Sequence, residues 1–288
     1  MSRASLLEKE AHLRNDIFNF FKLQFCVALL HGTTRGTVLI KTLPAAFQME
    51  EILFGLREHS SGLNCGQWDY IFSFVKRRRA EHAAALPDRS QVTMEVPFMA
   101  AYVRLLIYCK VTAMGGMSAY IPIKDDPKAN EIVTNDHDGT WIAHPLINKI
   151  AMEVFSEHMF GPNQYHIHRE GMKVAVSDLL NTSIPVKITE EGIHSSVATA
   201  LAYSDAGLVY VKYSSCVAGD AEYIDSIVDE LVPTLVGGSV TARKLEIVAA
   251  YLKKQVRQEW PSEFLTSDLM RYLAVADGVP EKWQKSVL

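Results

Sequence analysis

The chain has 288 residues, of which 48% are hydrophobic and 22% are charged, and its formal net charge is −4. These values are typical of a globular protein with a sizeable core, and the length allows one large domain or two modest ones. The composition gives no electrostatic basis for binding nucleic acid, and no apolar run reaches the ~20 residues that a membrane-spanning helix needs. We therefore expect neither nucleic acid nor a membrane as a partner.

The first part of the chain alternates between helical and strand-like patterns. Residues 1–30 have the apolar spacing of a helix, and residues 43–59 predict a second helix with Pro44 in its first turn. Short apolar runs predict strands at Thr37–Lys41, Tyr70–Phe74, Gln91–Met94, Ser118–Pro122 and Gly139–Ala143. Strands that alternate with helices at this spacing predict an α/β fold with a parallel sheet.

The pattern becomes helical from about residue 189 onward. The clearest helical stretches are Thr189–Tyr203 and Thr241–Gln258, and Thr189 followed by two glutamates suits a helix start. We therefore expect two domains, an α/β domain over residues 1–190 and an α-helical domain over residues 190–288.

Cysteine usage and the C-terminus bear on the compartment. The four cysteines are Cys26, Cys65, Cys109 and Cys216. They form no C-x-x-C pair, which argues against a disulfide framework or a zinc site and predicts reduced thiols in an intracellular compartment. The last three residues, Ser-Val-Leu, are close to the peroxisomal Ser-Lys-Leu address but lack its basic middle residue. The sequence leaves two compartments as alternatives, a peroxisome (or glyoxysome) and the cytoplasm.

Polar residues gather where the first predicted strand ends and before the second begins. Lys41 ends the first strand, the turn Asn64–Trp68 contains a glycine, and Asp69 follows it. In parallel sheets, the carboxyl ends of the strands and the loops after them carry the chemistry. These residues are therefore the first candidates for a functional site.

Seven blocks of sequence, in this order, resemble one known family. They are RGTVLIKTLPAAFQMEEILFGLREHSSGLNCGQWDYIFSFVKRRR (35–79), VTMEVPFMAAY (92–102), GGMSAYIPIKDDPKANE (115–131), HDGTWIAHP (137–145), PNQYHIHRE (162–170), DLLNTSIPVKITEEGI (178–193) and FLT (264–266). The chain resembles the malate synthase family, in its A-type branch of eukaryotes and bacteria. The resemblance implies a TIM (β/α)8 barrel followed by a C-terminal helical domain. Because the family has barrel strands before residue 37, we expect a partial barrel here, whose open edge calls for association with another chain.

The resemblance also implies an activity. Malate synthases are acyltransferases of the glyoxylate cycle that condense acetyl-CoA with glyoxylate to give malate and CoA. In the family a Mg²⁺ ion held by a Glu and an Asp polarises the aldehyde, an Arg stabilises the developing negative charge, and an Asp of the helical domain is the base. The implied partners are acetyl-CoA and glyoxylate, and the implied cofactor is Mg²⁺.

The family's site residues carry over to particular positions. Asp69 matches the metal-ligand Asp. The loop whose backbone N–H groups hold the glyoxylate carboxylate matches Asn64, Cys65, Gly66, Gln67 and Trp68. Gly66 permits a close backbone approach, and Gln67 stands where the family usually has Arg. A segment near the acetyl-CoA channel matches Pro162, Asn163 and Gln164, for which a buried turn is the alternative interpretation.

Lys41 departs from the family pattern, because the strand reads VLIKT where the family reads VLIET. An ammonium has no lone pair and cannot ligate a cation. At ~4 Å and an effective dielectric of ~20 its repulsion of a unit charge is about 4 kcal/mol, and a divalent ion doubles this. Three interpretations are open: Lys41 replaces the metal as the polarising cation beside Asp69, Lys41 fills an inactive site with a salt bridge, or the sequence contains an error.

The base and the arginine are harder to assign. Asp225 lies nine residues after Cys216, as the family's base does after its cysteine, and a solvated helix acid is the alternative. No arginine matches by motif, and Arg35 is the nearest candidate. The sequence therefore leaves two main functions open, a malate synthase-type acyltransferase and a non-catalytic, truncated family member or partner subunit. An acid–base enzyme built on Asp69 and Lys41 without metal is a third.

Overall fold

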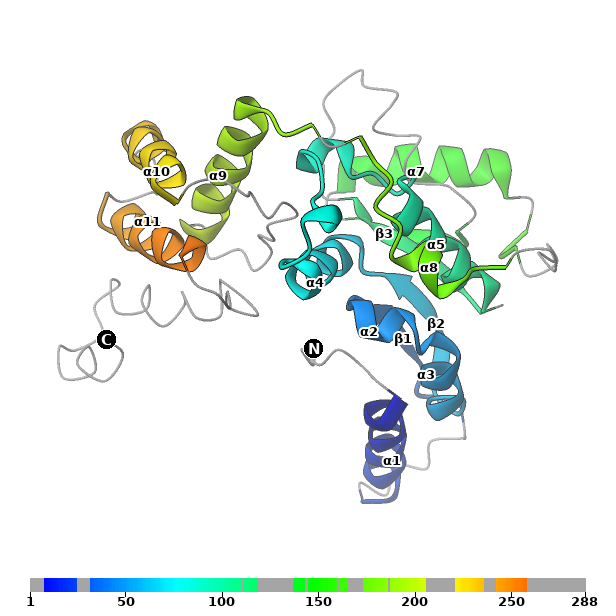
Figure 1. Ribbon diagram of the computed structural model, residues 1–288. Coiled ribbons are helices and arrows are strands. Elements are labelled where there is room, and N and C mark those ends of the chain that lie inside the picture. The colour runs from blue at the N-terminus through cyan, green and yellow to red at the C-terminus, as the bar shows by residue number, and fades with distance from the viewer. Residues whose placement is uncertain are drawn as a thin grey trace. The chain divides into compact units, whose positions relative to one another are not determined.

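The computed structural model describes residues 8–24, 32–109, 111–118, 137–142, 145–159, 161–164, 173–185, 187–205, 221–235 and 242–257. The chain separates into two compact units (Figure 1). The first unit comprises Met1–Arg77 and Thr93–Ile184, and the second comprises Arg78–Val92 and Pro185–Leu288. The second unit therefore includes residues 78–92, which a single division at residue 190 assigns to the α/β part.

A parallel sheet organises the first unit. Its strands are β1 (Gly36–Ile40), β2 (Ser60–Cys65), β3 (Ala113–Ser118) and β4 (Gly139–Ile142), in the spatial order β1-β2-β3-β4. Each strand pairs in parallel with the next one along the chain. Strands that are neighbours in both sequence and space, with helices between them, are the arrangement of a β/α barrel segment. The expected α/β fold with a parallel sheet is confirmed.

The strand predictions were right in part. β1 and β4 lie where they were expected, and β3 begins five residues before the predicted strand at Ser118. The predicted strand over Tyr70–Phe74 was wrong, because these residues belong to helix α4 (Gln67–Arg78). The predicted strand over Gln91–Met94 was also wrong. Gln91 ends the 3₁₀ turn η2 (Arg89–Gln91), and residues 92–94 form no strand. β2 was not predicted as a strand, and its last two residues, Asn64 and Cys65, were expected in a turn.

The errors have a physical cause. In α4 the buried side chains are Tyr70, Ile71, Phe74 and Val75, which share one face of a helix, and a short apolar run does not distinguish this face from a strand. β2 contains Ser60, Ser61 and Gly62, which are poor strand formers, and it pairs because two neighbouring strands hold it. Parts of the predicted elements (residues 1–7, 25–30, 119–122, 143, 241 and 258), Cys26, Cys216 and the C-terminal tripeptide lie outside the described residues.

The predicted helix over residues 43–59 is two short helices, α2 (Leu43–Ala46) and α3 (Met49–Gly55). Thr42 caps α2 by accepting a hydrogen bond from the Ala45 amide at 3.4 Å, and Pro44 lies in its first turn as expected. α1 (Glu8–Gln24) packs on α3, where a Cβ on Gly55 would lie 3.0 Å from the Ala11 Cβ. The absence of a side chain at Gly55 therefore allows the two helices to approach closely.

Helices line the sheet of the first unit. α5 (Pro97–Tyr108) contacts β2, and its aromatic rings stack with those of α4, with Tyr70 and Tyr102 centroids 4.1 Å apart and Phe74 and Phe98 centroids 4.4 Å apart. α7 (Pro145–His158) packs on β4, and α8 (Val176–Leu179) contacts α5. The stacked rings of Tyr70, Phe74, Phe98 and Tyr102 hold α4 and α5 against each other beside the carboxyl ends of β1 and β2.

The second unit is helical. α9 (Glu190–Asp205), α10 (Ala221–Leu235) and α11 (Ala242–Val256) pack around one apolar core that includes Leu201, Val228 and Leu245. α9 begins next to Thr189, as expected, and the Thr189 hydroxyl accepts a hydrogen bond from the Gly192 amide at 3.0 Å. Among the described helices of both units, none has the length and apolarity to cross a bilayer.

Asp88 attaches residues 78–92 to the start of α9. Its buried carboxylate accepts hydrogen bonds from the Thr189 hydroxyl at 2.6 Å and from the Thr189 amide at 3.2 Å. The segment also contains the 3₁₀ turn η1 (His82–Ala84), and the Asp88 amide donates to the Lys187 carbonyl at 3.2 Å. A helix N-terminus favours a carboxylate, so this contact joins hydrogen bonding with a favourable dipole.

This contact leaves no room for a side chain at Gly192, because a Cβ there would meet the Asp88 carboxylate at a distance that real atoms do not adopt. We expect Gly192→Ala to lower the free energy of unfolding by about 1–3 kcal/mol, since the carboxylate must leave its donors. Urea unfolding checks this. Gly36→Ala is the matched control, because nothing lies within 4 Å of a Cβ there. Equal midpoints for both variants would contradict the expectation.

Candidate functional site

The carboxyl ends of β1 and β2 bring Lys41 and Gly66 together. Ile40 is the register partner of Cys65, so Lys41 and Gly66 are the first residues beyond the two strands. A Cβ on Gly66 would lie 2.6 Å from the Lys41 Cβ and 2.9 Å from the Ile40 carbonyl oxygen. Gly66 therefore allows a close approach to the backbone of Lys41, whereas the close approach to a glyoxylate carboxylate that the sequence suggested stays a prediction.

Tyr102 of α5 holds the carboxyl ends of β1 and β2 together through hydrogen bonds to both. Its hydroxyl donates to the Ile40 carbonyl at 2.5 Å and accepts from the Gly66 amide at 2.9 Å, and the side chain is fully buried. Burial raises the pKa of Tyr102 well above its usual value, so the phenol keeps its proton and remains a donor. The Gly66 amide also donates to Ile40 at 3.1 Å. This amide, predicted to be among those that hold the glyoxylate carboxylate, is therefore used inside the fold.

The pleat of β2 sends Asn64 and Cys65 to opposite faces of the sheet. Asn64 is buried and donates from Nδ2 to the Gly115 carbonyl at 3.2 Å. Cys65 is buried with its Sγ 3.4 Å from Nε2 of His137, the residue two before β4. Burial raises the pKa of the Cys65 thiol to about 12, so the group stays neutral and is a poor nucleophile. Cys65 contributes packing at this edge.

Gln67, Trp68 and Asp69 form the first turn of α4 and are all half-buried. The loop expected over residues 64–68 is therefore the end of a strand, one glycine and a helix start. The Gln67 side chain lies over β3, since a Cβ on Gly116 would be 3.2 Å from its Oε1. The indole nitrogen of Trp68 is buried with no hydrogen-bond partner among the described residues. The positive end of α4 thus begins beside Lys41 and carries the Asp69 carboxylate.

Pro162, Asn163 and Gln164 are placed differently. The Gln164 amide donates to the Asp138 carboxylate at 2.6 Å, and its side chain donates to the His137 carbonyl at 3.0 Å. The Asp138 carboxylate also accepts from Ala113, the first residue of β3, at 2.9 Å. These contacts tie the segment to the amino ends of β3 and β4. Pro162 is exposed and Asn163 and Gln164 are half-buried, so the alternative of a buried turn is not supported. A role near acetyl-CoA stays a prediction.

Arg35 also lies away from the carboxyl ends of the strands. Its guanidinium donates to the Gly32 carbonyl at 2.9 Å and to the Ser60 carbonyl at 3.2 Å. Ser60 opens β2 and Gly36 opens β1, so Arg35 sits at the amino ends of both strands. The nearest arginine in sequence is therefore at the wrong end of the strands to stabilise charge near Lys41.

The donor set at the carboxyl ends of β1 and β2 does not fit Mg²⁺. Lys41 offers no lone pair, and Asp69 supplies a single carboxylate, whereas Mg²⁺ requires a near-octahedral set of oxygen ligands. Across the part of the chain that the structure describes, no group of three or more His, Cys, Asp or Glu side chains could hold a metal ion. The expected magnesium site is therefore not supported by the residues present.

Asp225, the candidate base, lies in α10 of the second unit. Arg257, just after α11, donates from Nη1 to its Oδ1 at 2.8 Å and from Nη2 to its other carboxylate oxygen. The hydrogen bond from Arg257 lowers the pKa of Asp225 below its usual range. A paired carboxylate of low pKa is a weak base, so the geometry favours the alternative of a helix acid at the surface. The assignment as the base stays a prediction.

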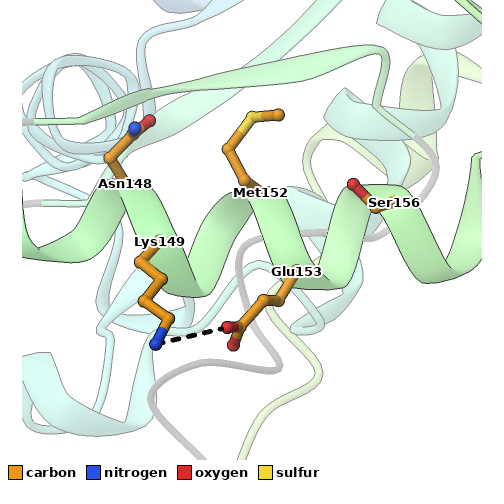
Figure 2. A pocket seen from close by; sticks show the side chains of 5 residues that line it. All are labelled: Asn148, Lys149, Met152, Glu153 and Ser156. Carbon is orange, nitrogen blue, oxygen red and sulfur yellow. Dashed lines mark ion pairs between the residues drawn. The ribbon is translucent and has the colours of Figure 1, made fainter.

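A shallow groove lies along α7 (Figure 2). It is lined by Asn148, Lys149, Met152, Glu153 and Ser156, which are all exposed. Lys149 and Glu153 pair with each other at 3.9 Å. None of the residues that the sequence singled out lines this groove, and its side chains offer no arrangement for catalysis.

The close contact at Gly66 is open to test. We expect Gly66→Ala to lower the free energy of unfolding by about 1–3 kcal/mol, because the new methyl group would overlap the backbone of Lys41 and Ile40. Urea unfolding measures this, with Gly36→Ala again as the control inside β1. A Gly66→Ala midpoint equal to that of the wild type would show that the two strand ends are not held at this distance.

The ion pair of Asp225 gives a pH prediction. Because its pKa is lowered in the folded state, the pair stabilises the protein above the usual pKa of a free Asp, and this contribution is lost as the pH falls through the lowered value. We expect Arg257→Gln to return the pKa of Asp225 toward its usual value. Carbon-detected NMR titration of the carboxylates checks this, with Asp229, which pairs with Lys253 instead, as the internal control. An unchanged Asp225 titration would contradict the pairing.

Comparison with known proteins agrees with the α/β fold and its parallel sheet. The family description "Malate synthase, TIM barrel domain" matches residues 6–182. The chain is 43% identical over 275 residues to the glyoxysomal malate synthase of Candida tropicalis, which covers 88% of this chain and 49% of the relative. It is 46% identical over 215 residues to malate synthase of Myxococcus xanthus (69% of this chain, 39% of the relative). It is 40% identical over 225 residues to malate synthase A of Escherichia coli (73% and 41%). The chain spans about half or less of the length of these curated relatives. With a parallel β/α sheet, a site at the carboxyl ends of its strands and matches over most of its length, the chain belongs to the malate synthase family.

Proposed function

We propose that this chain acts in the reaction of its family, the condensation of acetyl-CoA with glyoxylate to give malate and CoA. The observation that carries the proposal is that the family match over residues 6–182 includes both strand ends, Lys41 and Gly66–Asp69, which lie side by side. Malate synthases of Candida tropicalis and Escherichia coli are among the similar proteins. Acetyl-CoA and glyoxylate are the substrates proposed on this basis.

The reaction makes defined demands on the chain. A base removes a proton from the acetyl methyl group, the carbanion attacks the aldehyde carbon of glyoxylate, and the resulting alkoxide takes up a proton. Water then cleaves the thioester and releases the CoA thiol. A cation near the aldehyde and its carboxylate lowers the barrier to the attack. In this chain Lys41 and the first turn of α4, with Gln67 and Trp68, are the proposed binding groups for the glyoxylate carboxylate.

A non-catalytic role, as a family member that binds ligands or completes another chain, is the second candidate. Two observations favour it: Lys41 replaces a carboxylate of the family pattern, and Arg257 lowers the pKa of Asp225. Each missing electrostatic element typically costs about 10²–10³ in rate. Within the described residues β1 pairs only with β2, and Leu39 on β1 is 42% exposed. An exposed apolar edge strand of this kind supports association with a further chain.

The names of similar proteins also bear on the compartment of this chain. The relatives from Candida tropicalis and Cucumis sativus are named glyoxysomal malate synthases. We propose a peroxisome or glyoxysome for this chain, with the cytoplasm as the alternative.

A thiol-release assay separates the two functions. The purified chain is mixed with acetyl-CoA and glyoxylate in parallel reactions, one with MgCl₂ and one with EDTA. Free thiol is followed with Ellman's reagent, and malate is identified by mass spectrometry. We expect thiol release that requires glyoxylate and yields malate in equal amount. The reaction without glyoxylate is the control for simple thioester hydrolysis. A folded chain that forms no malate would contradict the catalytic proposal and support the second candidate.

A further inference from the structure

We propose that the carboxyl ends of β1 and β2 bind a small 2-oxo carboxylate without a divalent metal, and that the ammonium of Lys41 supplies the positive charge. The class of ligand rests on the proposed function, and the absence of a need for metal rests on the residues present. The inference departs from the family pattern, in which Mg²⁺ holds this position.

The first step of the argument is that Lys41 is held in place. Its Cα would lie 2.9 Å from a Cβ on Gly66, so the two backbones are in contact. The preceding carbonyl, of Ile40, accepts hydrogen bonds from both the Tyr102 hydroxyl and the Gly66 amide. The half-buried side chain of Lys41 therefore starts from a fixed position at the junction of the two strand ends.

The second step concerns the face of the sheet. Val38 and Ile40 are buried, whereas Leu39 between them is exposed. The alternation of a strand places Lys41 on the face of Leu39, and that face of β2 carries Asn64, the register partner of Leu39. Tyr102 and Cys65 contact each other on the opposite, buried face. Lys41 therefore shares its face of the sheet with the exposed Leu39 and the buried Asn64, and a ligand would approach it from the side of Leu39.

The third step is electrostatic. The ammonium of Lys41 repels a divalent cation, and Asp69 alone leaves most of the coordination sphere of such a cation unfilled. The same ammonium attracts a carboxylate and can donate to a carbonyl oxygen, which are the two functional groups of a 2-oxo acid. The first turn of α4 lies beside it and has the same sign of partial charge. The buried indole nitrogen of Trp68, unpartnered among the described residues, is a further donor in this turn.

The binding experiment uses the full chain and glyoxylate as the probe, with NMR titration in excess EDTA and in excess MgCl₂. We expect the same dissociation constant in both conditions. Lys41→Met should weaken binding by about 10- to 100-fold, as expected for the loss of a charged hydrogen-bond donor, and Lys41→Arg should restore most of it. Lys149→Met, a change at an exposed lysine of α7, is the matched control and should leave the affinity unchanged.

A second measurement tests the metal directly, with Mn²⁺ as a paramagnetic substitute for Mg²⁺ and electron paramagnetic resonance as the readout. We expect no bound Mn²⁺ in the wild type. Glyoxylate binding that requires Mg²⁺, or a wild-type Mn²⁺ site that Lys41→Met leaves intact, would overturn the inference and leave the proposed function standing. Glyoxylate binding that Lys41→Met does not weaken would also overturn it. Malate formation in the thiol-release assay is a separate readout, so failure of the proposed function is distinguishable from failure of this inference.

Discussion

The hydroxyl group of Tyr102 is the contact on which the geometry of the candidate site depends. It joins the last carbonyl of β1 to the first amide beyond β2, and it does so from a helix that lies 62 residues further along the chain. The backbone hydrogen bond from the Gly66 amide to the Ile40 carbonyl already links the two strand ends. The Tyr102 hydroxyl bonds to the same two groups and so reinforces this junction. The residues that it holds side by side are Lys41 and Gly66.

This arrangement explains which parts of the site the sequence could predict. The position of Lys41 at a strand end follows from the apolar run before it. Glycine was expected at residue 66 for a turn, but the structure requires it there because the backbone of Lys41 lies against it. Tyr102 offered no such signal, because it is one aromatic residue on an apolar helix and its hydrogen-bond acceptors are backbone atoms of other elements. Local sequence patterns identify residues that form turns or the buried faces of helices and strands. They do not identify a hydroxyl group whose hydrogen-bond partners are brought together only by folding.

The fold shows the same division. β1, β4, α9 and α11 have clear periodicity and lie where they were predicted, within a few residues. The end of β2 was expected to be a turn, and α4 was expected to contain a strand. Ser60 and Gly62 form a strand through pairing with β1, and the buried residues Tyr70, Ile71, Phe74 and Val75 share one face of a helix. Tertiary context decides short segments of this kind, since intrinsic preferences differ by only about 1 kcal/mol.

The attachment of residues 78–92 to the helical unit has a consequence for how the protein can be divided. The polypeptide passes between the two units three times, after residues 77, 92 and 184. A single proteolytic cut therefore cannot separate them, and a fragment that starts at residue 190 would lack the buried Asp88 and Thr189 that hold the first helix. Recombinant dissection of this protein would need the short 78–92 segment supplied in trans or fused to the helical fragment.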